Sequence, residues 1–192
     1  CDSTAILNLT INQADASYTN ITACDSVSWN GTTYNSSGTY SYSGATLPLV
    51  GTIYDGGYVF YIDSLTGIGF IATDNYIGTA EWGCSGTALN GADGQVIGTG
   101  YQNTLDIINA GCTSNNGNAT AASIAYNYNN GFSDWYLPSI DELSLVYQNL
   151  QSTGILNYNT GDPNNWYWAS TECQSNQAGS AADVHFTNGT IL

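Results

Sequence analysis

The residues best suited to bind a ligand lie between positions 162 and 167. Asp162, Asn164 and Asn165 supply a carboxylate and two amide groups, and Trp166 and Tyr167 follow directly. Such oxygens accept hydrogen bonds from sugar hydroxyls and coordinate hard cations such as Ca²⁺, while aromatic faces suit sugar rings or protein surfaces. We expect these five residues to form a recognition loop. A polar surface loop without a ligand is the alternative.

A second set of oxygen ligands lies in the glycine-rich stretch NGADGQVIGTG, residues 90–100. The stretch lacks the Lys of a phosphate-binding loop and the spacing of an EF-hand. Asn90, Asp93 and Asp162 are therefore the candidate ligands of a looser Ca²⁺ site. Calcium is the one cofactor that the sequence suggests.

Catalytic groups are harder to find. His185 is the only histidine, and it lies in DVHFT, where alternation predicts a strand. No cysteine lies in a recognisable nucleophile setting, and no two carboxylates have a defined catalytic spacing. The sequence therefore predicts a protein that is not an enzyme.

The charge of the chain is one-sided. It has no Lys or Arg and 15 Asp or Glu, which gives a net charge of −15. Phosphate contacts depend on Lys and Arg, so nucleic acid is not expected as a partner, and anionic membranes and sulfated glycans are disfavoured. Membrane insertion is not expected either, because no apolar run is long enough. The carboxylates must be hydrated, hydrogen-bonded or bound to a cation.

The five cysteines show no metal-site spacing. We expect Cys84 to pair with Cys112, which would close a loop worth about 3.5 kcal/mol of stability. Cys1 and Cys24 are expected to form a second disulfide, which leaves Cys173 as a free or intermolecular thiol. Disulfides indicate an extracellular or cell-surface location. The start at Cys1 in mid-pattern suggests a segment of a longer exported protein.

Residues 1–46 differ from the rest of the chain. CDSTAILNLTI alternates in polarity, and SVSWNGTTY contains two short β runs around Asn30-Gly31, a strong hairpin signal. CDST and CDSV, 23 residues apart, form a weak repeat. We expect an all-β module over residues 1–46 and a second domain over residues 47–192.

The second domain is expected to be α+β with long loops. GGYVFYI and GIGFIAT predict paired strands, GTGYQNTLDIINAGC and NATAASIAYNY short helices, and NWYWASTE and ADVHFTNGTI two closing strands. Ser139 and Glu142 form a capping box that should start a third helix after Pro138. Just upstream, Asp134 and Trp135 are expected to be structural, the Trp filling the core with its N–H bonded to a carbonyl. A glycan-stacking role for Trp135 is the alternative.

Six motifs carry a resemblance to a known family. In order, they are GGYVFYID, EWGC, GTGYQNTLDI, GFSDWYLPSIDEL, YWASTE and VHFTNGT. With them, residues 50–192 resemble the Lcl-type C-terminal domain family, also catalogued as domain of unknown function 1566. The resemblance implies a C-type-lectin-like or formylglycine-generating-enzyme-like fold, with a small twisted sheet, two or three short helices and long loops. It also implies adhesion and ligand binding at the cell surface.

Other likenesses and departures refine this expectation. Residues 1–46 resemble the Cys-containing β-repeats of giant surface adhesins of Bacteroidota, and Asp162-Pro163-Asn164 resembles the acidic-Pro-Asn triplet of calcium-dependent lectins. The chain lacks the basic residues with which the family's collagen-like adhesin binds sulfated glycans. It also lacks the Arg-containing strand that usually follows the NGT turn, and a missing closing strand predicts an exposed sheet edge.

Together these features predict a non-enzymatic, extracellular adhesion or ligand-binding domain of a large bacterial surface protein, which binds neutral glycans or protein surfaces. The alternative is a self-assembling subunit of an extracellular filament or matrix. Its copies would be joined by strand pairing or by a disulfide. The odd cysteine, the open edge and the mid-pattern start motivate this alternative.

Overall fold

A computed structural model of the chain describes residues 25–29, 32–39, 47–158, 165–173 and 180–192. The chain divides into two units, Cys1–Thr46 and Leu47–Leu192. In the first unit, β1 (Val27–Trp29) and β2 (Thr32–Tyr34) pair antiparallel. Val27 lies opposite Tyr34, which is the hairpin that the Asn-Gly signal predicts.

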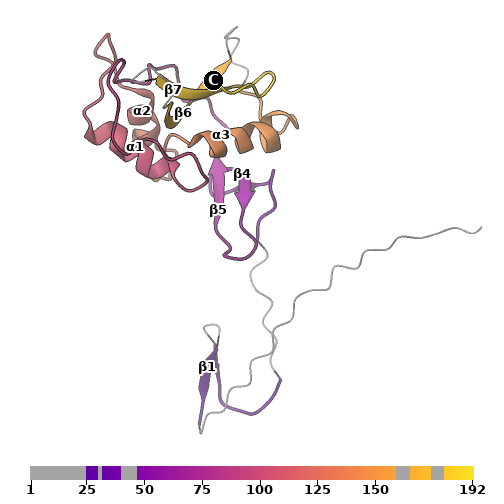
Figure 1. Cartoon of the computed structure of the whole chain (residues 1–192). Helices are drawn as coiled ribbons and strands as arrows, with labels where there is room; N and C mark the ends of the chain where they lie inside the picture. The colour runs from indigo at the N-terminus through magenta and orange to yellow at the C-terminus, as the bar shows by residue number, and fades with distance from the viewer. Residues whose placement is uncertain (1–24, 30–31, 40–46, 159–164, 174–179) are drawn as a thin grey trace, which may run out of the picture. The chain divides into compact units, whose positions relative to one another are not determined.

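The second unit contains two small antiparallel sheets among its described residues (Figure 1). The first has the order β3 (Ile53–Tyr54), β4 (Gly57–Ile62), β5 (Gly69–Ala72). The second pairs β6 (Trp166–Cys173) with β7 (Ser180–His185). β4, β5, β6 and β7 lie in or beside the segments that the sequence predicts as strands, whereas β3 was not predicted.

The helices of the described part of this unit are α1 (Gly100–Asn109), α2 (Ala121–Asn127) and α3 (Ile140–Val146), and α3 continues as a π-helical turn, η1 (Tyr147–Gln151). Thr120 caps α2 by accepting a hydrogen bond from the Ser123 amide at 3.3 Å. Ser139 and Glu142 form the predicted capping box of α3. The unit is therefore a mixture of helices and antiparallel strands, as predicted. No helix in the described residues is long and apolar enough to cross a membrane.

The main core lies where α3 packs against β4, β6 and β7. Its buried side chains include Phe60, Leu143, Val146, Leu150, Val184 and Phe186. Each stabilises the fold by about 1.5–3 kcal/mol through removal from water. A second cluster of Trp82, Ala92, Ile107 and Ala122 packs beside Cys84 and Cys112. These two cores fix the helices relative to the strands.

The outer edge of β7 is paired, which corrects the prediction of an exposed edge. The chain turns at Gly189, which has a φ of +74°, and residues 190–192 return along β7. The His185 amide donates to the Thr190 carbonyl at 2.8 Å, and Asp183 and Leu192 exchange two backbone hydrogen bonds of 3.2 Å. Residues 190–192 thus pair with this edge of β7 in place of the missing strand.

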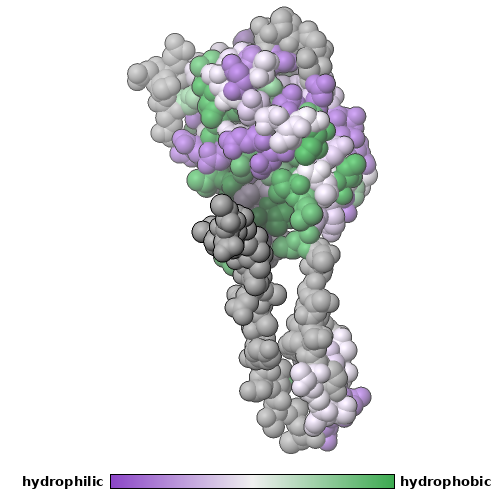
Figure 2. All heavy atoms as spheres, turned by 90° about the vertical axis from the view of Figure 1, so that its right-hand side faces the viewer, coloured by the Kyte–Doolittle hydropathy of each residue, from purple (hydrophilic) through white to green (hydrophobic). Residues whose placement is uncertain are grey.

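The sheet of β3, β4 and β5 exposes many apolar side chains. Leu49, Ile53, Leu65 and Ile68 are 73%, 68%, 95% and 57% exposed. Figure 2 shows hydrophobic residues gathered on the surface at the level of β4 and β5. We call these four residues and their neighbours in segment 47–68 the apolar sheet face.

Candidate functional site: an aromatic cavity

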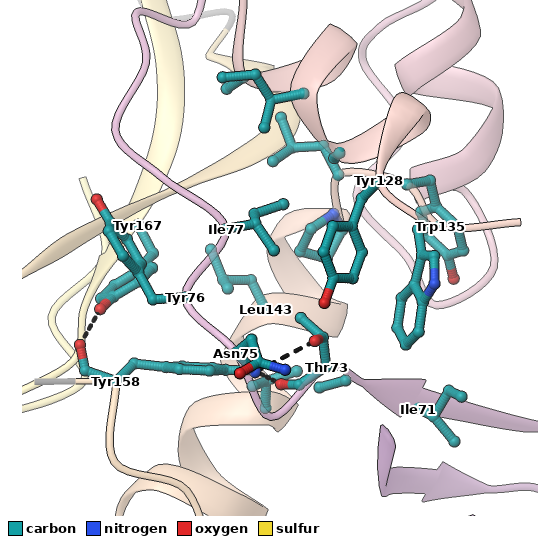
Figure 3. Close-up of a pocket in the computed structure, with 18 of the residues that line it drawn as sticks. Ile71, Thr73, Asn75, Tyr76, Ile77, Tyr128, Trp135, Leu143, Tyr158 and Tyr167 are labelled. Carbon is teal, nitrogen blue, oxygen red and sulfur yellow. Dashed lines mark hydrogen bonds between the residues drawn. The ribbon is translucent and has the colours of Figure 1, made fainter. Parts of the chain in front are cut away.

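A cavity of about 550 Å³ lies within the second unit, lined mainly by aromatic and aliphatic side chains. Its walls come from residues 69–80, from α2, from residues 132–138 and from the start of β6, and the core residues Phe60 and Leu143 also line it. Figure 3 shows Tyr76, Tyr158 and Tyr167 on one side, Tyr128 and Trp135 on the other, and Ile77 and Leu143 between them. We call this site the aromatic cavity.

One wall is a face of α2. Ala121, Ile124, Ala125 and Tyr128 line the cavity, and their spacing of three and four residues places them on one side of the helix. Small alanines leave room, while Tyr128 extends from the end of the helix and packs edge-on against Trp135, with ring centroids 5.8 Å apart. Tyr126 is exposed and does not line the cavity. The two tyrosines therefore form a natural test pair.

The segment 132–138 forms a second wall and corrects one prediction. Trp135 is half-buried and lines the cavity instead of filling a core cluster. Its indole N–H donates to the side-chain carbonyl of Asn130 at 2.9 Å, and the Asn130 amide donates to the Gly56 carbonyl at 3.1 Å. These two bonds fix the indole plane against the turn between β3 and β4. Asp134, beside it, is exposed and lines the cavity.

Three residues far apart in the chain fix the opposite wall. The Tyr158 hydroxyl donates to the Thr73 carbonyl, and the Tyr167 hydroxyl donates to the Tyr158 carbonyl (Figure 3). The Tyr158 and Tyr167 rings lie 5.8 Å apart. Burial, with the nearby Tyr167 and Asp74, raises the pKa of Tyr158 above its usual range. This phenol therefore remains a neutral donor.

The floor of the cavity is joined to the capping box of α3 through Tyr136. Its hydroxyl donates to the Glu142 carboxylate at 3.4 Å, and the same carboxylate accepts from the Gly98 amide at 2.7 Å and the Ser139 amide at 2.8 Å. Burial, reinforced by Glu142, raises the pKa of Tyr136 above its usual range. The Glu142 side chain is fully buried and has no basic residue beside it, because the chain has no Lys or Arg. This side chain is therefore held by hydrogen bonds and not by an ion pair with Lys or Arg.

The structure describes three of the five residues of the predicted recognition loop. Trp166 and Tyr167 line the aromatic cavity, and Trp166 is 37% exposed. Asn165 is half-buried, and its amide donates to Thr187 at 3.2 Å, whereas its side-chain oxygen is buried with no hydrogen-bond partner in the described residues. Asp162 and Asn164 lie outside the described residues.

The described residues include two of the three candidate calcium ligands. Asn90 and Asp93 are both exposed on one loop, away from the cavity lining, and Asp162 lies outside the described residues. In the part of the chain that is described, no three Asp, Glu, His or Cys side chains gather as a metal site would require. Calcium stays a prediction.

The cysteines divide into two groups. Cys84 and Cys112 form the predicted disulfide, with an S–S distance of 2.03 Å. Cys1 and Cys24 lie outside the described residues. Cys173 is a free thiol on β6, and burial, with Asp183 and Glu172, raises the pKa of Cys173. A thiol with a raised pKa is a poor nucleophile at neutral pH.

His185 lies on β7 as alternation predicts. It is opposite Trp166 in the strand register, and the two rings pack edge-on with centroids 4.7 Å apart. Asp183, two residues earlier, lies opposite Trp168. His185 is outside the lining of the aromatic cavity.

The sequence did not identify residues 71–80 or the face of α2 as parts of the site. The first segment carries no motif, because its residues contribute single side chains from a loop. The second has a readable signal, since Ala121, Ala125 and Tyr128 are spaced along one helical face. That spacing shows which residues share a face but does not show that the face borders a cavity.

Comparison with protein families matches residues 84–192 to the Lcl C-terminal domain. No curated protein and no solved structure matches the chain. The matched residues include all three helices, β6 and β7, together with the capping box, the disulfide and two walls of the aromatic cavity. Since the match covers more than half of the chain, the protein belongs to the Lcl C-terminal domain family.

Proposed function

We propose that this chain is a non-enzymatic, extracellular ligand-binding domain that serves adhesion in a large bacterial surface protein. The observation that carries the proposal is the aromatic cavity of about 550 Å³. Cavities of about 300–1,000 Å³, mainly apolar and with few polar groups, are the usual ligand sites of proteins. A neutral glycan or a group on another protein's surface is the expected ligand class.

Several finer features belong to the same proposal. Residues 47–192 follow a C-type-lectin-like arrangement, supported by their small antiparallel sheets, short helices and long loops. Residues 1–46 are a β-repeat of an adhesin, supported by the β1–β2 hairpin. The disulfide supports a location outside the cell. Antibody labelling of intact cells that produce the protein tests the location, because a protein inside the cell would not be labelled.

The ligand-binding role can be tested with two tyrosines of α2. We would screen the whole chain against a neutral-glycan array and, by ligand-observed NMR, against a library of small organic fragments, each with and without Ca²⁺. Tyr128→Ala should lower the affinity for each ligand that these screens identify by about tenfold, because the Tyr128 ring forms part of the cavity wall. Tyr126→Ala, the matched control, should leave them unchanged. An absence of ligands, or equal binding by both variants, would refute the proposal.

Self-assembly is the second candidate function, and the apolar sheet face favours it. Leu65 is 95% exposed, and Ile53 is 68% exposed. β5 is an edge strand of its sheet, and such edges pair with other chains. A second copy of the chain is the occupant that we propose for this face.

Sedimentation across a wide range of concentration tests self-assembly. The native chain should form larger species at high concentration, and Ile53→Ser with Leu65→Ser should prevent it. Val96→Ser, at a side chain that is 60% exposed elsewhere, is the control. Adding reductant tests whether Cys173 links copies covalently. A monomer at every concentration, with or without reductant, would reject this candidate.

A further inference from the structure

The electrostatic field around the aromatic cavity has one sign. Its charged lining residues are Asp55 and Asp134, and both are acidic. Asp74 lies close enough to raise the pKa of Tyr158, and Asp134 contributes to the raised pKa of Tyr136, after burial and Glu142. The chain has no Lys or Arg to offset these charges. A cation that approaches the cavity therefore meets only favourable charges among its lining residues.

Much of the hydrogen-bond donor capacity of the cavity rings is already used inside the protein. Five ring donors of its lining are used inside the protein: Trp135, Tyr136, Tyr158, Tyr167 and Trp168. Their acceptors are an amide oxygen, a carboxylate and backbone carbonyls. These five donors are therefore not available to a ligand. A neutral sugar needs both donors and acceptors from its site, whereas an ammonium group needs acceptors and π faces alone.

Aromatic rings line the cavity on two sides. Tyr128 and Trp135 meet edge-on, and so do Tyr76 and Tyr167, with centroids 5.8 Å and 6.3 Å apart. Rings set at steep angles to each other present several faces to the same space, as Figure 3 shows for the two sides of the cavity. Such aromatic walls are known to recognise quaternary ammonium groups, because each ring face is negative.

We propose that the aromatic cavity binds an organic cation, an ammonium group with apolar substituents, in preference to a neutral sugar. The proposal rests on the ligand-binding function proposed above and names the class of ligand. The cation is either a free small molecule or a lysine-type side chain on a partner protein. Asp134, between Phe132 and Trp135 in the chain, is one of the two charged residues of the cavity lining, with Asp55.

A matched pair of ligands isolates the charge. Choline and 3,3-dimethylbutan-1-ol have nearly the same shape, and only choline is charged. We expect the whole chain to bind choline about tenfold or more tightly than the alcohol, measured by calorimetry or ligand-observed NMR. Equal binding of the two would overturn the preference for a cation and leave the cavity as a ligand site.

A matched pair of variants locates the charge. Asp134→Asn and Asp141→Asn remove the same charge, but Asp141 is exposed on α3 and does not line the cavity. Asp134→Asn should weaken choline several-fold and leave the alcohol unchanged, and Asp141→Asn should change neither by more than about twofold. Equal loss in both variants would show diffuse attraction and would overturn the site. Far-ultraviolet circular dichroism checks that both variants are folded.

Two further outcomes separate this proposal from the function on which it rests. If choline does not bind while neutral sugars bind and are lost in Tyr128→Ala, only the cation is wrong. If no probe depends on Tyr128, the ligand-binding function is wrong as well. Capped lysine amide and its trimethylated form identify the source when choline binds. If one of these two lysine probes binds more tightly than choline, the ligand is a side chain of a partner protein. If both bind more weakly than choline, the ligand is a free small molecule.

Discussion

The buried carboxylate of Glu142 provides the sharpest test of how this fold is held together. It accepts hydrogen bonds from the Gly98 amide at 2.7 Å, the Ser139 amide at 2.8 Å and the Tyr136 hydroxyl at 3.4 Å. The three donors come from two segments, the loop before α1 and the stretch 136–139, and the side chain is fully buried. Replacing Glu142 should therefore loosen the start of α3, the loop before α1 and the floor of the cavity together.

The size of the effect follows from these contacts. A hydrogen bond to a charged group contributes about 1.5–3 kcal/mol, so the two short bonds give about 3–6 kcal/mol. The desolvation of a carboxylate without a salt-bridge partner opposes them. Removal of the side chain also leaves the buried Ser139 N–H unpaired, which adds to the loss of stability. We expect Glu142→Ala to lower the free energy of unfolding by about 4 kcal/mol, or Tm by roughly 10 °C. Glu142→Gln, which keeps one acceptor, should cost about 2 kcal/mol.

Urea unfolding followed by tryptophan fluorescence measures these differences. Asp141→Asn is the matched control, because Asp141 is next in the chain but exposed, and its cost should be within about 0.5 kcal/mol. If both Glu142 variants unfold within about 1 kcal/mol of the native chain, desolvation cancels the hydrogen bonds and the reasoning is refuted. A loss in Asp141→Asn as large as in Glu142→Ala would refute it too.

Three more predictions concern stability. Replacing Cys84 and Cys112 by Ser should lower the free energy of unfolding by about 3.5 kcal/mol in urea, and reductant should then have no further effect, whereas an unchanged midpoint would contradict the loop-closure argument. Burial raises the pKa of Asp183, so its charged form destabilises the fold at neutral pH. Asp183→Asn should therefore raise the free energy of unfolding at pH 7 by at most about 1 kcal/mol, measured in urea. This gain should vanish below about pH 4, where the Asp183 carboxyl of the native sequence is protonated in both the folded and the unfolded chain. A Cβ at Gly100 would lie 2.6 Å from the Ser139 nitrogen, so Gly100→Ala should lower the free energy of unfolding by about 3 kcal/mol. Gly117, with φ +77°, has open space around it, so Gly117→Ala should lower it by about 1 kcal/mol. Equal losses in the two variants would refute the close packing at Gly100.

Local signals in the sequence predicted the elements well. The capping box needs only Ser139 and Glu142, three residues apart, and the hairpin needs only a turn signal between two short β runs. Tyr167 was predicted in the recognition loop, and it also packs against the core residue Phe186, with ring centroids 4.3 Å apart. The capping box and the hairpin depend on neighbours in the chain, so the sequence contains their causes in full.

The site could be predicted only in part, because its walls come from segments far apart. Trp166 and Tyr167 were expected to bind ligand and do line the cavity. Trp135 was expected in the core, yet its N–H finds its carbonyl on Asn130, five residues away, and the ring faces the cavity. An indole N–H needs a hydrogen-bond acceptor whether the ring lies in a core or at a cavity wall, so this rule does not distinguish the two positions. The partner of Trp135, Asn130, bonds in turn to Gly56, 74 residues away in the chain, which no local pattern shows.

The family match and the folding unit of this chain have different boundaries. The match begins at Cys84, but Phe60 and Trp82 are 3% and 4% exposed in the two cores, and the Asn149 side chain donates to the Phe60 carbonyl at 3.0 Å. Losing either aromatic side chain would cost about 3–5 kcal/mol, a large fraction of the stability of an ordinary domain. Residues 47–83 are therefore part of the same unit and also supply one wall of the aromatic cavity. A wall outside the shared segment can change without disturbing the capping box or the disulfide. Ligand preference can then differ between chains that have the same domain.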